Sequence, residues 1–470
     1  MTVHRLAIDV ASRRLRQSFH GANLSLWRRF GRNLSLSLGG AIVIVGIKAC
    51  QSLILTRALR IEDYGRLLII INLITFLNLF IGLRVSDLMF RFFAAFKTAD
   101  NRAAVQGLLL VCFGISIATG VLIAVVVFTF SPFLAQHLCQ SRDFAPLFSI
   151  YGCTSLLTAL TDVSAPVLRI YDRFKTIVVP QMLGGLVTFL VVASYIFTTD
   201  HYNLTVVITA FAVGVVVQTV PPLVHAFLLV RPYLANFRPR MSIAALGEYK
   251  PQLRACLFNS NMSGYLKIAV SPGDLFLLGI FCAPEQVALY GLAKQLIAPS
   301  ALLATNVQFA ITPEVTLLVA DRKFLQLREL VHRYFKLMLV LGGLLSVASI
   351  LITWFVVLRI SRPEYVASLP IFFMLLIAAW ALLFAAMLRP LALNFDLLKW
   401  DNLAHIATAL LLLCLILAGW LTGLTMAFAQ LLSAVVLRGV FGLPVLSRLR
   451  DPDRRPSETT FATEPSSLQE

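Results

Sequence analysis

The sequence predicts an all-α polytopic membrane protein with about 12 transmembrane helices. Three observations predict this class: 59% of the 470 residues are hydrophobic, only 13% are charged, and the apolar residues form separate runs long enough to cross a membrane. A soluble domain could not cover so much apolar surface with so few polar groups. The composition therefore excludes a secreted disulfide scaffold, a disordered regulator and an ordinary cytosolic enzyme.

Twelve segments meet the requirement of roughly 20 apolar residues for one crossing of the hydrocarbon layer. The first six expected spans are Leu34–Leu55, Leu67–Gly82, Ala104–Phe130, Leu147–Leu168, Thr176–Phe197 and Leu204–Val230. The second six are Ser260–Phe281, Val287–Ile311, Leu337–Leu358, Leu369–Leu393, Leu403–Trp420 and Leu424–Leu446. The second and eleventh spans are short and the seventh is polar, so these three carry the weakest apolar signal.

The basic residues orient the spans. Three quarters of the 40 Lys and Arg residues lie in the connectors on the N-terminal side of the membrane. This excess predicts that both termini are cytoplasmic. A net charge of +17 would also suit a nucleic-acid-binding protein. Because the charges cluster in short connectors between apolar runs, they instead indicate membrane orientation, and no nucleic-acid partner is expected.

The longest connector separates spans six and seven and divides the chain into two lobes. We expect a basic cytoplasmic N-terminal segment (1–33), an N-lobe (34–230), a cytoplasmic linker (231–259), a C-lobe (260–447) and a disordered cytoplasmic tail (448–470). The N-terminal segment is either a basic helix on the inner membrane surface or a solvated flank, and the sequence leaves both open.

The two halves share a short pattern. RALRIEDYG follows span one and APEQVALYG follows span seven, and each ends in a Tyr-Gly pair, Tyr64–Gly65 and Tyr290–Gly291. Superposing the two pairs places Lys48 opposite Asp274. Six spans in each half would give parallel repeats, a pattern typical of transporters. A shared dipeptide also arises by chance, so both explanations stay open.

These segments carry a family resemblance. ILTRALRIEDYGRLLIIINLI and RVSDLMFRFF in the first half, and GDLFLLGIFCAPEQVALYGLAKQL and ITPEVTLLVADRK in the second, resemble Wzx-type polysaccharide (O-antigen) flippases. LRIYDRFK after span four also fits. This is the polysaccharide transport branch of the multidrug/oligosaccharidyl-lipid/polysaccharide exporter superfamily. The resemblance implies two six-helix lobes around a central cavity. The cargo it implies is a polyprenyl-diphosphate-linked oligosaccharide, flipped across a bacterial inner membrane for O-antigen, exopolysaccharide or capsule.

The resemblance also implies membrane lipids as partners, with a polysaccharide polymerase and other assembly proteins as candidates. No cofactor is expected, and the coupling ion, H+ or Na+, stays open. The chain lacks the extra spans of the peptidoglycan-precursor flippases. The multidrug branch typically carries an acidic residue in its first span, where this chain has Lys48. A cation-coupled small-molecule exporter is nevertheless the alternative function.

Charges inside the spans are the candidate substrate-binding residues. Placing an ionised group at mid-bilayer costs at least ~2.5–3.5 kcal/mol on insertion scales, so each such group is expected to have a functional or structural role. Cations there could hold a diphosphate. The candidates are Lys48, Asp274 and Lys294 near mid-depth, Lys267 two helical turns before Asp274 and Asp162 in span four, together with Arg91 on the cytoplasmic side of span two, where it could meet the headgroup.

Each of these charges also has a structural explanation. The buried groups could pair with one another to hold the lobes together, and Lys48 with Asp274 is then the expected pair. Asp162 could cap or pack a helix, and Arg91 could be an orientation charge. The prolines at Pro221–Pro222 and Pro272 could bend their spans during transport or kink them statically. The choice between function and structure stays open for all of them.

The sequence does not contain the enzyme motifs that we searched for. It has no GxxxxGK[ST] loop, no HExxH and no CxxC pair. A membrane polymerase or ligase acting on the same lipid carrier is a third hypothesis, but such enzymes need a long basic outer loop. The longest outer connector here holds one Arg. We therefore expect a transport protein and no enzyme.

Overall fold

The computed structural model describes residues 39–40, 43–93, 96–97, 100–199, 202–234, 239–268, 273–320, 324–388, 391, 398–437 and 442. Over these residues the chain forms helices and connectors, without a strand. The N-terminal segment predicted at 1–33 and the tail predicted at 448–470 lie outside them. Seven of the described helices are long and apolar enough to cross a membrane, and shorter apolar helices cover 406–417 and 423–435.

The first half begins with a helix at residues 43–58. It continues with α2 (Ile61–Phe80), α3 (Val85–Leu88), a π-helical turn (Met89–Phe93), α5 (Arg102–Leu138), α6 (Ala145–Gly152), α7 (Thr154–Ile170), α8 (Lys175–Thr198) and α9 (Leu204–Val230). A 3-10 turn (Arg231–Leu234) and α10 (Pro239–Ala245) lead into the second half.

The second half contains α11 (Lys250–Ile268), α12 (Gly273–Phe281), α13 (Pro284–Ala320), α14 (Phe324–Phe355), α15 (Ser368–Ala385), α17 (Leu398–Leu417) and α18 (Gly423–Leu432). π-Helical turns extend α14 to Ile360 and α18 to Leu437, and a 3-10 turn (Pro363–Ala367) precedes α15. Every predicted span overlaps a described helix.

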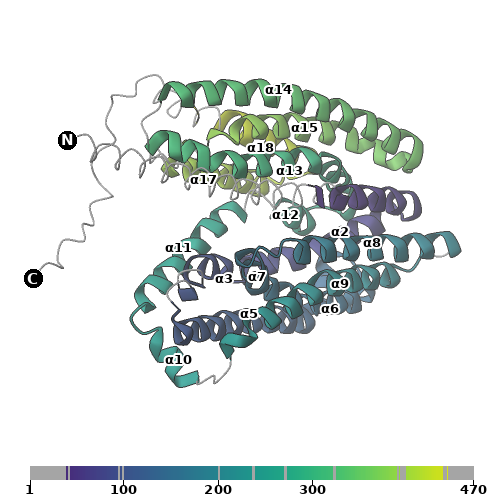
Figure 1. Ribbon diagram of the computed structural model, residues 1–470. Coiled ribbons are helices and arrows are strands. Elements are labelled where there is room, and N and C mark those ends of the chain that lie inside the picture. The colour runs from purple at the N-terminus through teal and green to yellow at the C-terminus, as the bar shows by residue number, and fades with distance from the viewer. Residues whose placement is uncertain are drawn as a thin grey trace, which may run out of the picture.

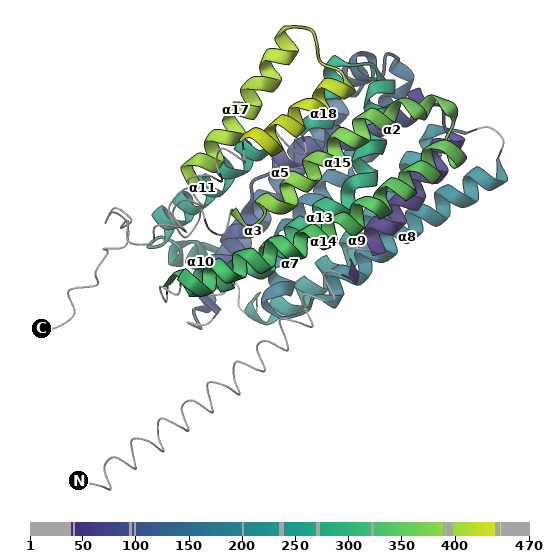
Figure 2. The same ribbon diagram turned by 90° about the horizontal axis from the view of Figure 1, so that it is seen from above.

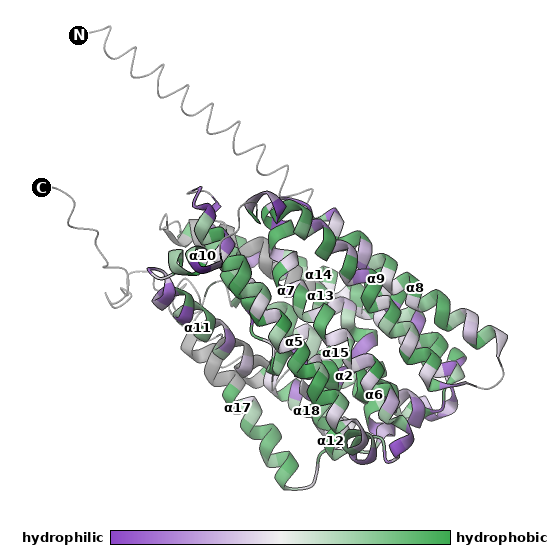
Figure 3. Cartoon of the chain, turned by 90° about the horizontal axis from the view of Figure 1, so that it is seen from below, coloured by the Kyte–Doolittle hydropathy of each residue, from purple (hydrophilic) through white to green (hydrophobic). Residues whose placement is uncertain are grey.

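The helices form two groups (Figure 1). Helices α2 to α9 make up one group, and α13, α14, α15, α17 and α18 make up the other; α10 packs against α5 of the first group, and α11 leads from there toward the second. Seen from above, the helices of both groups run along the same general direction (Figure 2). Hydrophobic residues cover most of their length, and hydrophilic residues gather toward the ends, around α10 and α11 among other places (Figure 3).

The predicted ends of the spans match the helices to different degrees. α9 has the same bounds as predicted span six, and it is continuous through Pro221 and Pro222. α2 begins at Ile61, earlier than predicted for span two, and ends at Phe80; after a break at residues 81–84 the chain forms α3 and the π-helical turn as far as Phe93. The hydropathy pattern stops at Gly82 because Arg84, Asp87 and Arg91 interrupt the apolar run. The chain is helical again at 85–93 because the other side of this segment, including Met89 and Phe93, is buried.

The packed interior consists of three apolar cores. One core joins both halves, and it includes Leu68 and Ile123 of the first half together with Leu278 and Val287 of the second. The other two are separate: one lies within the first half around Phe93, and one within the second half around Met338. The shared core lies toward the end of the bundle that the sequence predicts to be outside. We call this end, with residues 56–66 and 356–365, the outer end.

Helices α2 and α13 make the closest contact between the halves. A Cβ atom on Gly65 would lie 1.9 Å from the carbonyl oxygen of Pro284, and one on Gly291 would lie 2.3 Å from Leu68. Each Tyr-Gly pair of the predicted repeat therefore lies at this contact. Small residues allow two membrane helices to approach so closely.

Polar contacts add to the shared core at the outer end. The hydroxyl groups of Thr56 and Ser361 lie 3.0 Å apart. The guanidinium of Arg362 donates to the carbonyl oxygens of Arg57 and Ala58, which end the first helix. The two halves thus share an apolar core at the outer end, whereas on the inner side α11 of the second half packs against α3, with the Arg84 N–H donating to Asn261 Oδ1 at 3.1 Å.

Candidate functional site

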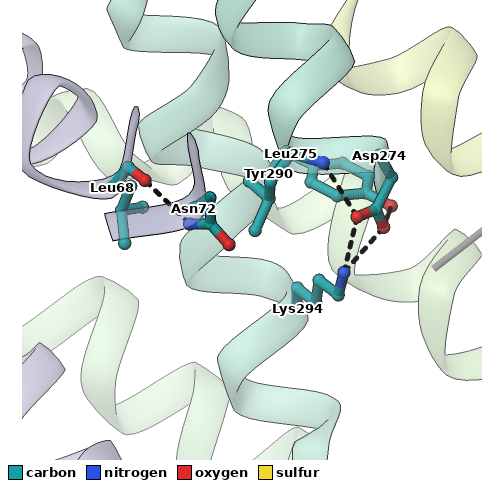
Figure 4. Close-up of polar contacts among 6 residues, drawn as sticks. All are labelled: Leu68, Asn72, Asp274, Leu275, Tyr290 and Lys294. Carbon is teal, nitrogen blue, oxygen red and sulfur yellow. Dashed lines mark hydrogen bonds and ion pairs between the residues drawn. The ribbon is translucent and has the colours of Figure 1, made fainter. Parts of the chain in front are cut away.

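Asp274 lies in the first turn of α12 and is 2% exposed. One of its carboxylate oxygens, Oδ1, accepts the backbone N–H of Leu275 at 2.8 Å, and the other, Oδ2, accepts the hydroxyl of Tyr290 at 2.7 Å. Lys294 Nζ donates to both oxygens, at 2.6 and 2.8 Å (Figure 4). A carboxylate at a helix N-terminus is favoured by the helix dipole. Together these contacts neutralise the buried charge.

The α12–α13 hairpin brings this cluster together. α12 ends at Phe281 and α13 begins at Pro284, so the two helices run antiparallel and side by side. Tyr290 and Lys294 are four residues apart and therefore lie on the same side of α13. Lys294 is ten residues from the start of α13, which puts it about 15 Å into the helix. That depth is close to the middle of a hydrocarbon layer of ~30 Å.

Lys294 differs from its partner in exposure. Its side chain is 31% exposed, whereas that of Asp274 is 3% exposed. A lysine ammonium has three N–H donors. Asp274 takes two of them, so one stays available on the exposed side of the ammonium. The pair is therefore a buried anion capped by a cation that can bind a further acceptor.

α2 contributes Asn72 to the same place from the first half. Its side chain lies beside Tyr290, with its amide nitrogen donating to the Leu68 carbonyl at 2.8 Å (Figure 4). The search for charged residues in the sequence missed Asn72 because its side chain is neutral. Two asparagines in the otherwise apolar α2, Asn72 and Asn78, are the signal that could have identified it.

Lys48 lies in the first helix, ten residues before its end at residue 58, at a depth of about 15 Å. This helix packs against α8, where Ile47 faces Gly185. The side chain of Lys48 is exposed, and its backbone carbonyl accepts the hydroxyl of Ser52. Among the described residues, Lys48 forms no ion pair.

The expected pairing of Lys48 with Asp274 is therefore wrong. Asp274 pairs with Lys294 of its own half. Matching positions in the two halves give matching depths, but they do not determine which side chains face each other. The ion pair consequently does not hold the lobes together, and Lys48 lies at the same depth without a charge partner in the part of the chain that the structure describes.

The remaining candidates lie nearer the predicted inner side. Asp162 is half-buried on α7, within electrostatic range of Arg84 and Asp87. Arg91 is exposed, with its guanidinium 5.5 Å from the ring centre of Phe92. Lys267 belongs to α11, but its side chain lies outside the described residues. The structure thus joins Asp274 and Lys294 in one cluster and places Asp162 and Arg91 elsewhere. Among the described residues, no group of His, Cys, Asp or Glu could hold a metal ion.

A family model described as polysaccharide biosynthesis protein matches residues 54–360. The chain belongs to this family. The match includes the closest contact between the halves and the whole Asp274–Lys294 cluster. The resemblance seen in the sequence is therefore confirmed. No curated protein matches the chain in sequence.

Solved structures establish the fold of this polysaccharide biosynthesis protein. A multidrug resistance MATE family transporter in an inward-facing conformation matches with a TM-score of 0.63 and 14% identity, covering 88% of this chain and 99% of its own. The lipid II flippase MurJ in an inward closed conformation matches with a TM-score of 0.64 and 13% identity, covering 87% and 86%.

A transporter from Pyrococcus furiosus, described by the reverse polarity of its binding pocket, matches with a TM-score of 0.59 and 12% identity. It covers 89% of this chain and 95% of its own. These proteins belong to the MOP superfamily of polytopic transporters, so the predicted all-α transporter fold is confirmed. The chain is a multi-pass membrane protein of a family that serves polysaccharide biosynthesis.

Proposed function

We propose that the protein flips a polyprenyl-diphosphate-linked oligosaccharide across the bacterial inner membrane, with both termini cytoplasmic, for the synthesis of a surface polysaccharide. The position and partial exposure of Lys294 are the main support for this proposal. Lys294 is a cation near mid-depth whose carboxylate partner is buried while its own side chain is partly exposed. A diphosphate offers strong acceptors to such an ammonium. The family match and the flippase neighbour support the same kind of cargo.

Lys48 and Lys294 have separate roles in this proposal. The Asp274–Lys294 pair is close to neutral as a whole, so it binds a phosphate through the free ammonium hydrogen. Lys48 has no ion-pair partner among the described residues, so it supplies the net positive charge. Alternating access of the two lobes would then carry the headgroup past these lysines while the polyprenyl chain stays in lipid. Lys267, Asp162 and Arg91 stay as candidate contacts with the headgroup.

A cation-coupled exporter of small molecules is the alternative, because multidrug transporters share the fold. A drug or metal cation would need a carboxylate free to receive it. The carboxylate of Asp274 already holds the ammonium of Lys294 at 2.6 Å. An incoming cation would have to displace that ammonium, so the cluster favours an anionic cargo.

Complementation of cells that lack the gene tests the proposal. We expect Lys48→Ala and Lys294→Ala to abolish surface polysaccharide while the protein still reaches the membrane. Lys250→Ala, which changes an exposed lysine at the start of α11, is the matched control and should restore the polymer. Normal polymer from both the Lys48 and the Lys294 variant would remove these lysines from the site.

The side of the membrane on which lipid-linked repeat units accumulate distinguishes a flippase from a polymerase or ligase. Cells without a flippase should accumulate single lipid-linked repeat units on the cytoplasmic side. Cells without a polymerase or ligase should expose these units outside. Sensitivity to small cationic drugs, with normal polysaccharide, would support the exporter instead.

A further inference from the structure

Neutral polar side chains occupy one side of α2. Asn72, Thr75 and Asn78 are three residues apart, a spacing that keeps them close together on the helix surface. α2 packs against α5, α6, α7 and α9 of the first half and against α11, α12 and α13 of the second. Lipid therefore does not surround this helix. Of its polar side chains, Asn72 and Asn78 are half-buried and Thr75 is exposed.

α7 has a polar face that continues this surface. Thr158, Thr161, Asp162 and Arg169 lie on one side of α7, whereas Val163 and Val167 on the other side are buried in the core of the first half. A face with an aspartate and an arginine is turned away from lipid in a membrane protein. In Figure 1, α7 lies on the side of the first half that faces the second.

The two helices meet at a hydrogen bond. Asn78 Nδ2 donates to Ser155 Oγ on α7 at 3.3 Å. Asn72, at the other end of the row, is drawn on the Tyr290 side of the Lys294 cluster in Figure 4. The row from Asn72 to Asn78 is about 9 Å long at 1.5 Å per residue. We call Asn72, Thr75, Asn78, Thr158 and Thr161 the hydroxyl strip.

The hydrogen bonds of the strip use its donors and leave acceptors. All five side chains donate to a backbone carbonyl three or four residues earlier in their own helix. The carbonyl oxygen of the Asn78 side chain is buried without a partner. A buried acceptor without a donor costs free energy. The Asn78 oxygen has no accessible surface, so the oxygens that the strip can offer to a ligand with O–H donors are those of Asn72 and of the threonine hydroxyls.

We infer that the hydroxyl strip binds the sugar residues of the cargo while Lys294 binds its diphosphate. Sugars are rich in neutral hydroxyl donors, which is the chemistry that the oxygens of Asn72 and the threonines match. The two parts of the site come from different halves: α2 and α7 provide the strip, and α13 provides the cation. This inference rests on the proposed function and adds the residues that distinguish one glycan from another.

Binding to the purified protein in detergent tests the inference with two probes. Farnesyl diphosphate has the charged group without a sugar. The polyprenyl-diphosphate-linked oligosaccharides extracted from the source cells have both. We expect wild type to bind the glycan-bearing lipid more tightly. Thr75→Val with Thr158→Val, and separately Asn72→Leu, should weaken that binding about 2- to 10-fold for each hydrogen bond lost. Binding of farnesyl diphosphate should stay unchanged.

Thr209→Val is the matched control, because Thr209 on α9 is an exposed threonine with the same bond to its own helix, at Thr205. It should bind both probes as wild type does. Unchanged binding of farnesyl diphosphate also shows that the strip variants are folded. Strip variants that keep the wild-type preference for the glycan, or a wild type with no such preference, would overturn the inference. Failure of both probes to bind wild type would instead overturn the proposed function.

Discussion

Lys294 and Asp274 depend on each other for stability as well as for function. Removing Lys294 leaves a buried carboxylate held only by Tyr290 and one backbone N–H. Breaking a buried pair in this way costs about 3–5 kcal/mol. Replacing both partners with neutral groups removes that cost. Stability and transport can therefore be separated at this pair.

We expect Lys294→Gln alone to lower the thermal unfolding temperature of the purified protein clearly. Lys294→Gln combined with Asp274→Asn should restore most of that loss, because no unpaired charge stays buried. The double variant should still fail to restore surface polysaccharide, because the ammonium is absent. Thermal unfolding in detergent and complementation are the two measurements. A double variant that is stable and active would assign the pair a structural role alone.

From the sequence, the membrane depth of these charged residues could be predicted better than the residues with which they pair. Depth follows from counting residues along a helix, so Lys48, Asp274 and Lys294 could be placed near mid-membrane. The partner of Asp274 depends on how α12 and α13 are paired across a short turn, which no helical periodicity records. Asn72 carries no charge, and although the asparagines of α2 mark a polar position, its place near the cluster follows only from the packing of α2 against α13.

At the scale of the helices, the close approach of α2 and α13 depends on two glycine residues. Gly65 and Gly291 each lie where a Cβ atom would clash with the opposite helix. The bounds of the helices were more predictable than this contact. Apolar runs located α9 to the residue, but they did not reveal α3 and the π-helical turn after α2, because charged residues interrupt the apolar pattern there.

We expect Gly65→Ala to force α2 and α13 apart and to destabilise the protein, because its Cβ would meet backbone atoms of Pro284 rather than a side chain that can move. The loss should be in the range of about 1–3 kcal/mol typical of overpacking. Gly114→Ala on α5 is the control, since nothing lies within 4 Å of the added Cβ. Equal unfolding temperatures for the two variants would contradict the importance of this contact.

At the scale of the whole molecule, the outer end joins the two halves. If the transport cycle separates them there, a covalent bond across that end should stop transport. Thr56 and Ser361 are suited to such a bond, because their hydroxyl oxygens are 3.0 Å apart. The exposed cysteines Cys50, Cys153 and Cys414 would first be replaced by serine.

We expect Thr56→Cys with Ser361→Cys to form a disulfide under oxidation and to lose flipping activity in proteoliposomes. A reducing agent should restore the activity, and each single cysteine variant should be unaffected. The band shift after gel electrophoresis reports the disulfide, and flipping is measured on the same vesicles. Full activity with the disulfide formed would mean that the outer end stays closed throughout the cycle.

The core that Leu68, Ile123, Leu278 and Val287 build together has a consequence for how the protein is made. Each half, synthesised alone, would leave its part of this apolar interface exposed, and the N-terminal half emerges from the ribosome first. The N-terminal half must therefore remain in the bilayer with this interface covered by lipid or a chaperone until α12 and α13 are inserted. Two separately expressed halves should accordingly survive in cells only when they are produced together.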